Sequence, residues 1–159
     1  MVIVSIIAAL LLFFSLINGF KDGALKQTVS IISLLIAIPL TGLCYHWLAR
    51  LFSFIPGENW ENFLGFIITM GIIMVAFYFI FLVPRKHFEK SWKEGPLFRM
   101  IGAALGFLNT AIGMVLFAVV LNAYPIFDWL QRAVSGSDVI NWLDSWLGFI
   151  QYMLPSVFR

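Results

Sequence analysis

The chain has 159 residues, of which 62% are hydrophobic and only 11% are charged. Soluble domains hold about 45–50% apolar and about 25% charged residues, so this chain lacks the polar shell that water requires. Its formal net charge of +2 is small, and no basic stripe indicates a nucleic-acid partner. Composition therefore excludes an ordinary soluble domain and predicts a single integral membrane domain over residues 1–159.

Four long apolar runs follow one another along the chain, each about long enough to cross a bilayer as a helix. They are continuous rather than alternating, which favours helices over a membrane β-barrel. No linker of soluble-domain size separates them. We predict an all-α membrane protein with four transmembrane helices, over residues 2–18, 28–48, 63–83 and 100–122.

Individual residues within and beside these runs predict further details of the helices. The first lacks the basic stretch and the small-residue cleavage site of a secretory signal peptide, so we expect it to be retained. Pro39 lies inside the second run, where a missing backbone donor predicts a kink. The third run is expected to stop at Pro84, ahead of a basic segment.

The tail predicts an amphipathic helix over residues 138–153, with Ser137 or Asp138 as its N-cap. Its polar stripe is narrow and the rest is rich in tryptophan, as in a helix that lies in the membrane interface. The usual basic face is missing, so burial of apolar area or docking onto the helical body must hold this segment. A short or re-entrant fifth membrane segment is the alternative, and Asp144 in its middle argues against that reading.

Basic residues predict the orientation, because cytoplasmic loops carry an excess of Lys and Arg. The first loop holds Lys21 and Lys26 and the third holds five basic residues, whereas the second holds Arg50 against two glutamates. The first and third loops are therefore expected in the cytoplasm and both termini outside it. Aromatic residues flank the proposed outer ends as interfacial anchors would: Tyr45, Trp47, Trp60, Tyr124 and Trp129.

Residues that carry chemistry are scarce. The four runs hold no Asp, Glu, Lys or Arg, the groups on which ion paths and proton relays depend. Cys44, the single cysteine, excludes an internal disulfide, and with His46 it makes no recognised metal-ligand spacing. His87 lies in the basic third loop without a nucleophile or an orienting partner. We therefore expect no enzymatic activity, no metal site and no cofactor.

Small residues recur along one face of the fourth run. Gly102, Gly106, Asn109 and Gly113 follow at spacings of four, three and four. Such a face lets helix backbones approach closely, and Asn109 can hydrogen-bond across the contact. We expect it to pack within the chain against the small residues of the second run, with a contact between copies or a polar pore lining as alternatives. The second-run residues of this contact would be Ser30, Ser33, Ala37 and Thr41. A polar pore would be lined by Ser30, Ser33, Thr41, Asn109 and Thr110.

Two segments of the chain resemble the colicin V production protein family. One is Asn-Gly-Phe-Lys-Asp-Gly-Ala-Leu-Lys-Gln at residues 18–27, and the other is Arg-Met-Ile-Gly-Ala-Ala-Leu-Gly-Phe-Leu at residues 99–108. Phe98 stands where family members often have an acidic residue, and Asn109-Thr110 where they often have a basic residue and a glycine. The motif residues that match are Gly19, Lys21, Gly23, Lys26, Arg99, Gly102 and Gly106.

The first of these segments also has a physical reading. Gly19 and Gly23 permit a tight turn between antiparallel spans, and Lys21 and Lys26 hold that turn at the cytoplasmic headgroups. A topogenic hairpin without further function is the simplest interpretation of this loop.

The resemblance implies a small multi-pass protein of the bacterial inner membrane, tied to toxin export and envelope integrity, without an established catalytic site or cofactor. We expect a scaffold or accessory subunit whose partners are membrane lipid, further copies or other membrane proteins. The alternative is a small channel or permease for a neutral or hydrophobic solute, since such a path needs no buried charge.

Overall fold

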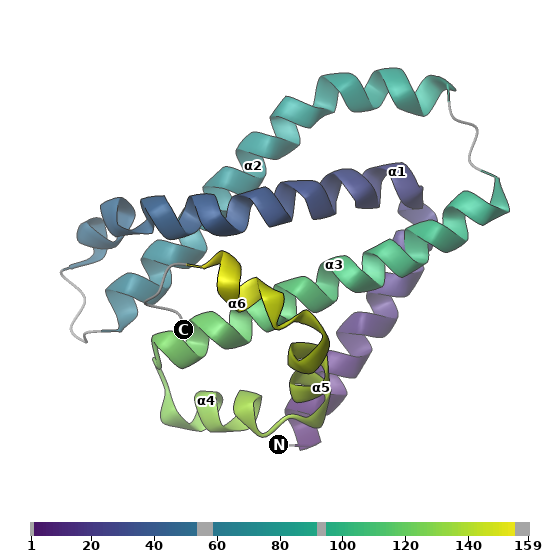
Figure 1. Ribbon diagram of the computed structural model, residues 1–159. Helices are drawn as coiled ribbons and strands as arrows, with labels where there is room; N and C mark the ends of the chain where they lie inside the picture. The colour runs from purple at the N-terminus through teal and green to yellow at the C-terminus, as the bar shows by residue number, and fades with distance from the viewer. Residues whose placement is uncertain (1, 54–58, 92–94, 155–159) are drawn as a thin grey trace.

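The computed structural model describes residues 2–53, 59–91 and 95–154. Helices make up most of these residues and none is in a strand, which confirms the all-helical prediction for the part described (Figure 1). In chain order the elements are α1 (Val2–Ala49), the short 3-10 helix η1 (Arg50–Phe52), α2 (Trp60–Ser91), α3 (Pro96–Ala123), α4 (Asp128–Ser135), α5 (Asp138–Leu147) and α6 (Phe149–Met153).

The longest helix, α1, is bent sharply at Gly23. The backbone there has φ 77° and ψ 166°, a conformation outside the helical region that is essentially open only to glycine. We term residues 2–22 the first arm and residues 24–49 the second arm, and Figure 1 shows them leaving the bend in different directions. The first two predicted spans thus belong to one bent helix.

Within the described residues, three helices are long and apolar enough to cross a membrane: Val2–Phe52, Trp60–Phe81 and Pro96–Ala123. These helices agree with a multi-pass membrane protein. Glu58 and Lys93, which contributed to the orientation count, lie outside the described residues.

Two prolines lie inside long helices. At Pro39, where the sequence predicts a kink, the backbone keeps helical φ and ψ, and the departure from them inside α1 is at Gly23. The helix α2 continues past Pro84 to Ser91, beyond the end of the third apolar run. A proline removes one hydrogen bond, and the Arg, Lys and Glu residues after it are good helix formers that let the helix go on.

The centre of the molecule is α3. Half of its most apolar stretch is buried, against 17% for α1 and 22% for α2. It packs on both arms of α1, and the second arm also packs on α2. The largest fully buried side chains include Ile38, Tyr45, Phe66, Ile112 and Leu121, which come from these three helices. The first arm and the later part of α2 leave large apolar side chains exposed, as expected for surfaces that face lipid.

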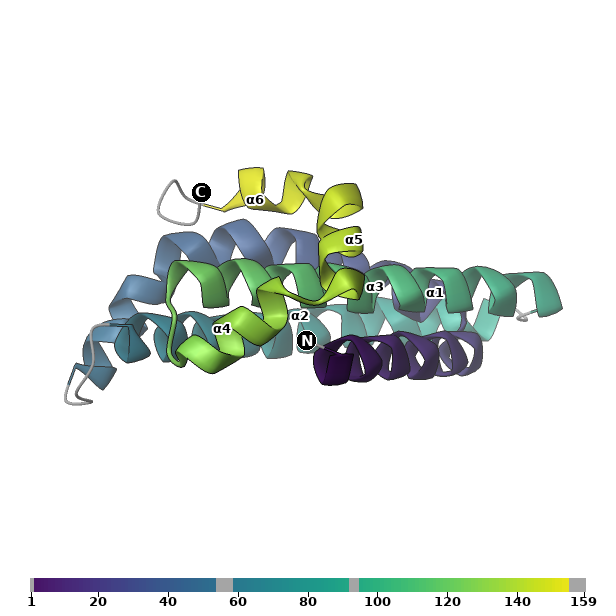
Figure 2. The ribbon, with the colours of Figure 1, turned by 90° about the horizontal axis from the view of Figure 1, so that it is seen from below.

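The tail returns onto this body as three short helices. The sequence did not predict α4, and the continuous helix expected over residues 138–153 is divided at Gly148 into α5 and α6. In Figure 2, α3 runs between the first arm on one side and α6 on the other. Leu143 and Ile150 are buried on the docked side of α5 and α6, so the tail packs onto the helical body.

Candidate functional site

The first arm and α3 cross in very close contact. A Cβ atom built on Gly102 would lie 2.5 Å from the carbonyl oxygen of Gly19, and one built on Gly106 would lie 2.6 Å from that of Ser15. All three glycines are buried. These backbones touch because the side chains are missing, which is the arrangement that small residues permit between membrane helices. We term Gly19, Gly102 and Gly106 the glycine crossing.

The two glycines of the first motif have separate roles. Gly23 makes the bend, since its φ of 77° favours glycine. Gly19 lies one turn earlier inside the helix, and its role is the close approach to Gly102 rather than the turn. The motif therefore combines a bend and a helix contact.

Charged residues lie on both sides of the bend. Lys26 forms an ion pair with Asp22 of the first arm across it, and the amide of Gln27 donates to the same carboxylate at 3.4 Å. Lys21 is exposed, as is Arg99 in the first turn of α3. The four basic and acidic groups thus remain at the surface around the bend and the start of α3, where lipid headgroups and water can reach them.

The polar residue on the α3 face bonds to the second arm. The Nδ2 of Asn109 donates to the Oγ of Ser30 at 2.9 Å. The expected pairing of this face with the second run is therefore present at Asn109, whereas Gly102 and Gly106 of the same face meet the first arm. The helix α3 presents its small residues to both arms at once.

The remaining polar candidates are not gathered into one lining. Ser30 and Ser33 line a cavity between the second arm and α2, and the hydroxyl of Ser33 donates to the carbonyl of Val29 at 2.8 Å. Thr110 and Gly113 line another cavity, bounded by the first arm, α4 and α5. Thr41 is fully buried, and its Oγ1 has no hydrogen-bond partner among the described residues. The structure thus places Ser30 and Ser33 at one cavity and Thr110 at another.

A buried tyrosine pair was not anticipated. The hydroxyls of Tyr45 and Tyr124 lie 2.7 Å apart, and both side chains are buried, whereas the sequence had suggested interfacial anchors. Two other predicted anchors, Trp47 and Trp129, are 82% and 63% exposed. The position of an aromatic residue near a helix end does not show whether its side chain is buried or exposed. The side of the helix that faces α3 and the side that faces lipid are both apolar.

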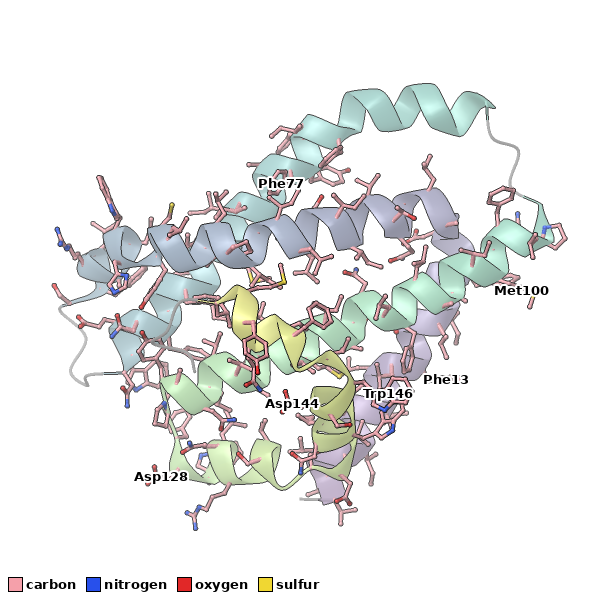
Figure 3. The ribbon with its side chains drawn as sticks, in the orientation of Figure 1. Phe13, Phe77, Met100, Asp128, Asp144 and Trp146 are labelled. Atoms are coloured by element: carbon pink, nitrogen blue, oxygen red, sulfur yellow. The ribbon has the colours of Figure 1, made fainter. Side chains whose placement is uncertain are left out.

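A second contact ties the start of the chain to the tail. The hydroxyls of Ser5 and Ser137 lie 2.9 Å apart, and Ser137 is fully buried. In α6, the amide of Gln151 donates to both carboxylate oxygens of Asp144, at 3.1 and 3.4 Å. Figure 3 shows Asp144 and Trp146 on the tail, and this bond gives the mid-helix acid a polar partner within the tail.

Neither Cys44 nor His46 is part of a cluster that could bind a metal. Cys44 is a free, exposed thiol. The ring of His46 lies against that of Tyr45, with centroids 4.0 Å apart and the two planes tilted by 42°. In residues 2–53, 59–91 and 95–154, no group of three His, Cys, Asp or Glu side chains is placed to hold a metal ion.

Comparison with known proteins gives one match. The model of a family described as Colicin V production protein matches residues 4–148. No curated protein matches the chain, and no solved structure matches it. The family match runs through both glycine motifs, the bend, the membrane-length helices and α5. On this match the chain belongs to the colicin V production protein family.

Proposed function

We propose that this protein is a non-catalytic scaffold or accessory subunit of the bacterial cytoplasmic membrane, acting in envelope maintenance or in the export of a toxin or peptide. The observation that carries the proposal is the family match over residues 4–148, together with membrane-length apolar helices. Association with other membrane proteins, or with further copies, is the means by which it acts.

The use of the polar groups supports a role in association. Asn109 bonds Ser30, and the hydroxyls of Thr28, Ser33 and Thr69 donate to backbone carbonyls of their own helices. Hydroxyl and amide groups that are bonded in this way stabilise helices and their contacts. These polar groups therefore hold the helices together. The exposed apolar side chains of the first arm and α2 offer a surface on which membrane partners can pack.

We further propose four membrane crossings, with each arm of α1 spanning once and both termini outside the cytoplasm. The basic residues around the bend and before α3 support this orientation. The Ser5–Ser137 contact supports a common side for the first arm's start and the tail. A bond of 3.0 Å from Asn59 Nδ2 to the carbonyl of Pro125 likewise supports one side for the α2 start and the α3–α4 connection.

Cysteine labelling tests this topology. In a Cys44→Ser background, single cysteines replace Lys21, Leu97, Ser53 or Arg132, all of which are exposed. With an impermeant maleimide on intact cells, we expect labelling at positions 53 and 132 only, and labelling at 21 and 97 after permeabilisation. The reverse pattern would invert the topology, and labelling of position 21 together with 53 would remove the crossing by the second arm.

Loss of the gene in its own host tests the function. We expect lower secretion of an exported peptide toxin or raised sensitivity of the envelope to detergent, restored by the wild-type gene. Native mass spectrometry after gentle extraction should show an oligomer or a bound membrane protein. A strictly monomeric, partner-free species with normal export and a normal envelope in the deletion strain would contradict the proposal.

A further inference from the structure

The second arm and α2 enclose a groove that the proposed function does not use. The two helices are packed together near the start of α2 and diverge toward its end, and Phe77 lies where the divergence begins (Figures 1 and 3). The cavity between them has a volume of about 360 Å³. Its wall on α2 consists of apolar and aromatic residues: Met74, Val75, Phe77, Tyr78 and Phe81.

The opposite wall changes in polarity along its length. Lys26 is at the end nearest the bend, and Val29, Ser30 and Ser33 follow along the second arm. The Lys26 side chain is 39% exposed. Its ammonium group has three N–H donors, and the ion pair with Asp22 requires one of them. The groove is therefore apolar along most of its length, with a positive group at one end.

The charge of this end of the molecule is also positive. Figure 1 shows the bend of α1, the end of α2 and the start of α3 at one end. Among the side chains described at this end, Lys21, Lys26 and Arg99 are basic and Asp22 is acidic. Three basic residues against one acidic residue give these described groups a net charge of +2. The field at the mouth of the groove thus attracts an anion.

We propose that the groove between the second arm and α2 binds an anionic phospholipid of the surrounding bilayer, with one acyl chain along the apolar wall and the headgroup phosphate at Lys26. Basic pockets between membrane helices on the cytoplasmic side are the sites where such headgroups bind. The inference is independent of any scaffold or export role, because it depends only on the groove and its charge.

A phospholipid fits these features better than a protein segment does. The groove opens on the side of the molecule where Val75, Tyr78 and Ile80 are more than half exposed, so lipid chains are the nearest available occupant. An apolar helix from a partner protein or from a second copy could fill the groove with its side chains. It would bring no negative group to Lys26 at the positive end. The combination of an apolar length and one cationic end corresponds to a chain and its phosphate.

Native mass spectrometry of the full-length protein in detergent tests the proposal by titration with phosphatidylglycerol or with phosphatidylcholine of the same acyl chains. We expect the anionic lipid to bind more tightly. A basic residue near anionic lipid contributes about 1 kcal/mol, so Lys26→Gln should weaken phosphatidylglycerol binding about fivefold and leave phosphatidylcholine unchanged. Lys21→Gln, at an exposed position that does not line the groove, serves as the charge control.

A matched pair of substitutions on α2 locates the lipid. Val75 lines the groove and is 56% exposed, and Ile72 is 55% exposed but does not line it. Val75→Trp should fill the groove and abolish selective binding, whereas Ile72→Trp should retain it. Both positions face outward enough to accept the indole without loss of the fold, which thermal unfolding of each variant checks.

Three results would overturn the proposal. One is equal affinity of the wild-type protein for the two lipids. Another is selective binding that survives Val75→Trp in a folded variant, since the lipid would then lie elsewhere. The third is a dimer that is lost with Val75→Trp while no lipid preference is seen, which would make a second copy the occupant.

Discussion

The two contacts of α1 differ in kind. At the glycine crossing, the first arm and α3 meet through their backbones, and no space remains between Gly19, Gly102 and Gly106. Between the second arm and α2, large side chains such as Phe77 hold the helices apart and leave a cavity of about 360 Å³. One helix therefore has a contact without side chains just before its bend and an opening lined by side chains just after it. The comparison indicates that small residues allow close packing of the helices here, and that large side chains leave an opening.

The largest expected effect is at the glycine crossing. Gly102→Ala places a methyl group within 3 Å of backbone atoms of Gly19, Gly23 and Ala24, none of which can move without separating the helices. Overpacking of this kind costs about 3 kcal/mol.

Gly113→Ala is the matched control on the same helix, because nothing lies within 4 Å of its added Cβ. That control should be neutral or more stable by about 0.5–1 kcal/mol, since alanine favours helix. Unfolding in mixed detergent micelles measures both, and equal stability of the two variants would mean that the crossing is not close-packed.

A somewhat smaller loss is expected at the bend. Gly23 has φ 77° and ψ 166°, and a side chain in that region adds strain of about 2 kcal/mol. Gly23→Ala should therefore lower the free energy of unfolding by this amount, or straighten α1 and release the glycine crossing. Gly95→Ala is the control, because Gly95 has an ordinary extended φ of −69°. Far-UV circular dichroism with thermal unfolding separates the two, and an unchanged Gly23→Ala variant would mean that the bend is absent in the membrane.

The bond between α3 and the second arm is expected to contribute less. Removing it by Asn109→Ala or Ser30→Ala should give a coupling free energy of about 0.6 kcal/mol, and at most about 1.7 kcal/mol, in a double-mutant cycle. The four proteins of the cycle are compared by the same unfolding measurement in micelles. Additive single losses would show that the 2.9 Å contact is not a hydrogen bond in solution.

The smallest effect is expected at the open groove. Val75→Ala removes apolar atoms that are already 56% exposed, and lipid or detergent takes their place. The free energy of unfolding should change by no more than about 0.5 kcal/mol. A loss comparable with that of Gly102→Ala would contradict the comparison, because it would mean that α2 closes on the second arm in the membrane.

Much of the fold follows from the hydropathy of the chain. Continuous apolar runs predict membrane-length helices because lipid leaves few alternatives for the backbone. The described part of the chain has three such helices. The position of the bend was less accessible, since residues 18–27 contain two glycines and helix formers on both sides. Only the backbone conformation shows that Gly23 bends the chain while Gly19 remains helical. Similarly, α4 has eight residues and no long apolar period that would predict it.

The candidate site was predictable as a face but not as a set of partners. The spacing of Gly102, Gly106 and Asn109 places them on one side of α3. Both arms of α1 offer small residues, so the spacing cannot indicate which arm each of them meets. The structure assigns the glycines to the first arm and Asn109 to the second. The groove beside α2 has no local signal at all, because its walls are far apart in the sequence.

The pairing of Gly19 with Gly102 has a consequence for biogenesis. Ribosomes deliver the first arm to the membrane well before α3 has been made, so for that interval its glycine surface has no partner from the same molecule. Only when the centre of the chain has inserted can the two backbones meet, and only after Ser137 emerges can it join Ser5. Tertiary packing of the first arm is therefore completed late in synthesis. Ser5, one of the first residues to be made, is among the last to reach its partner.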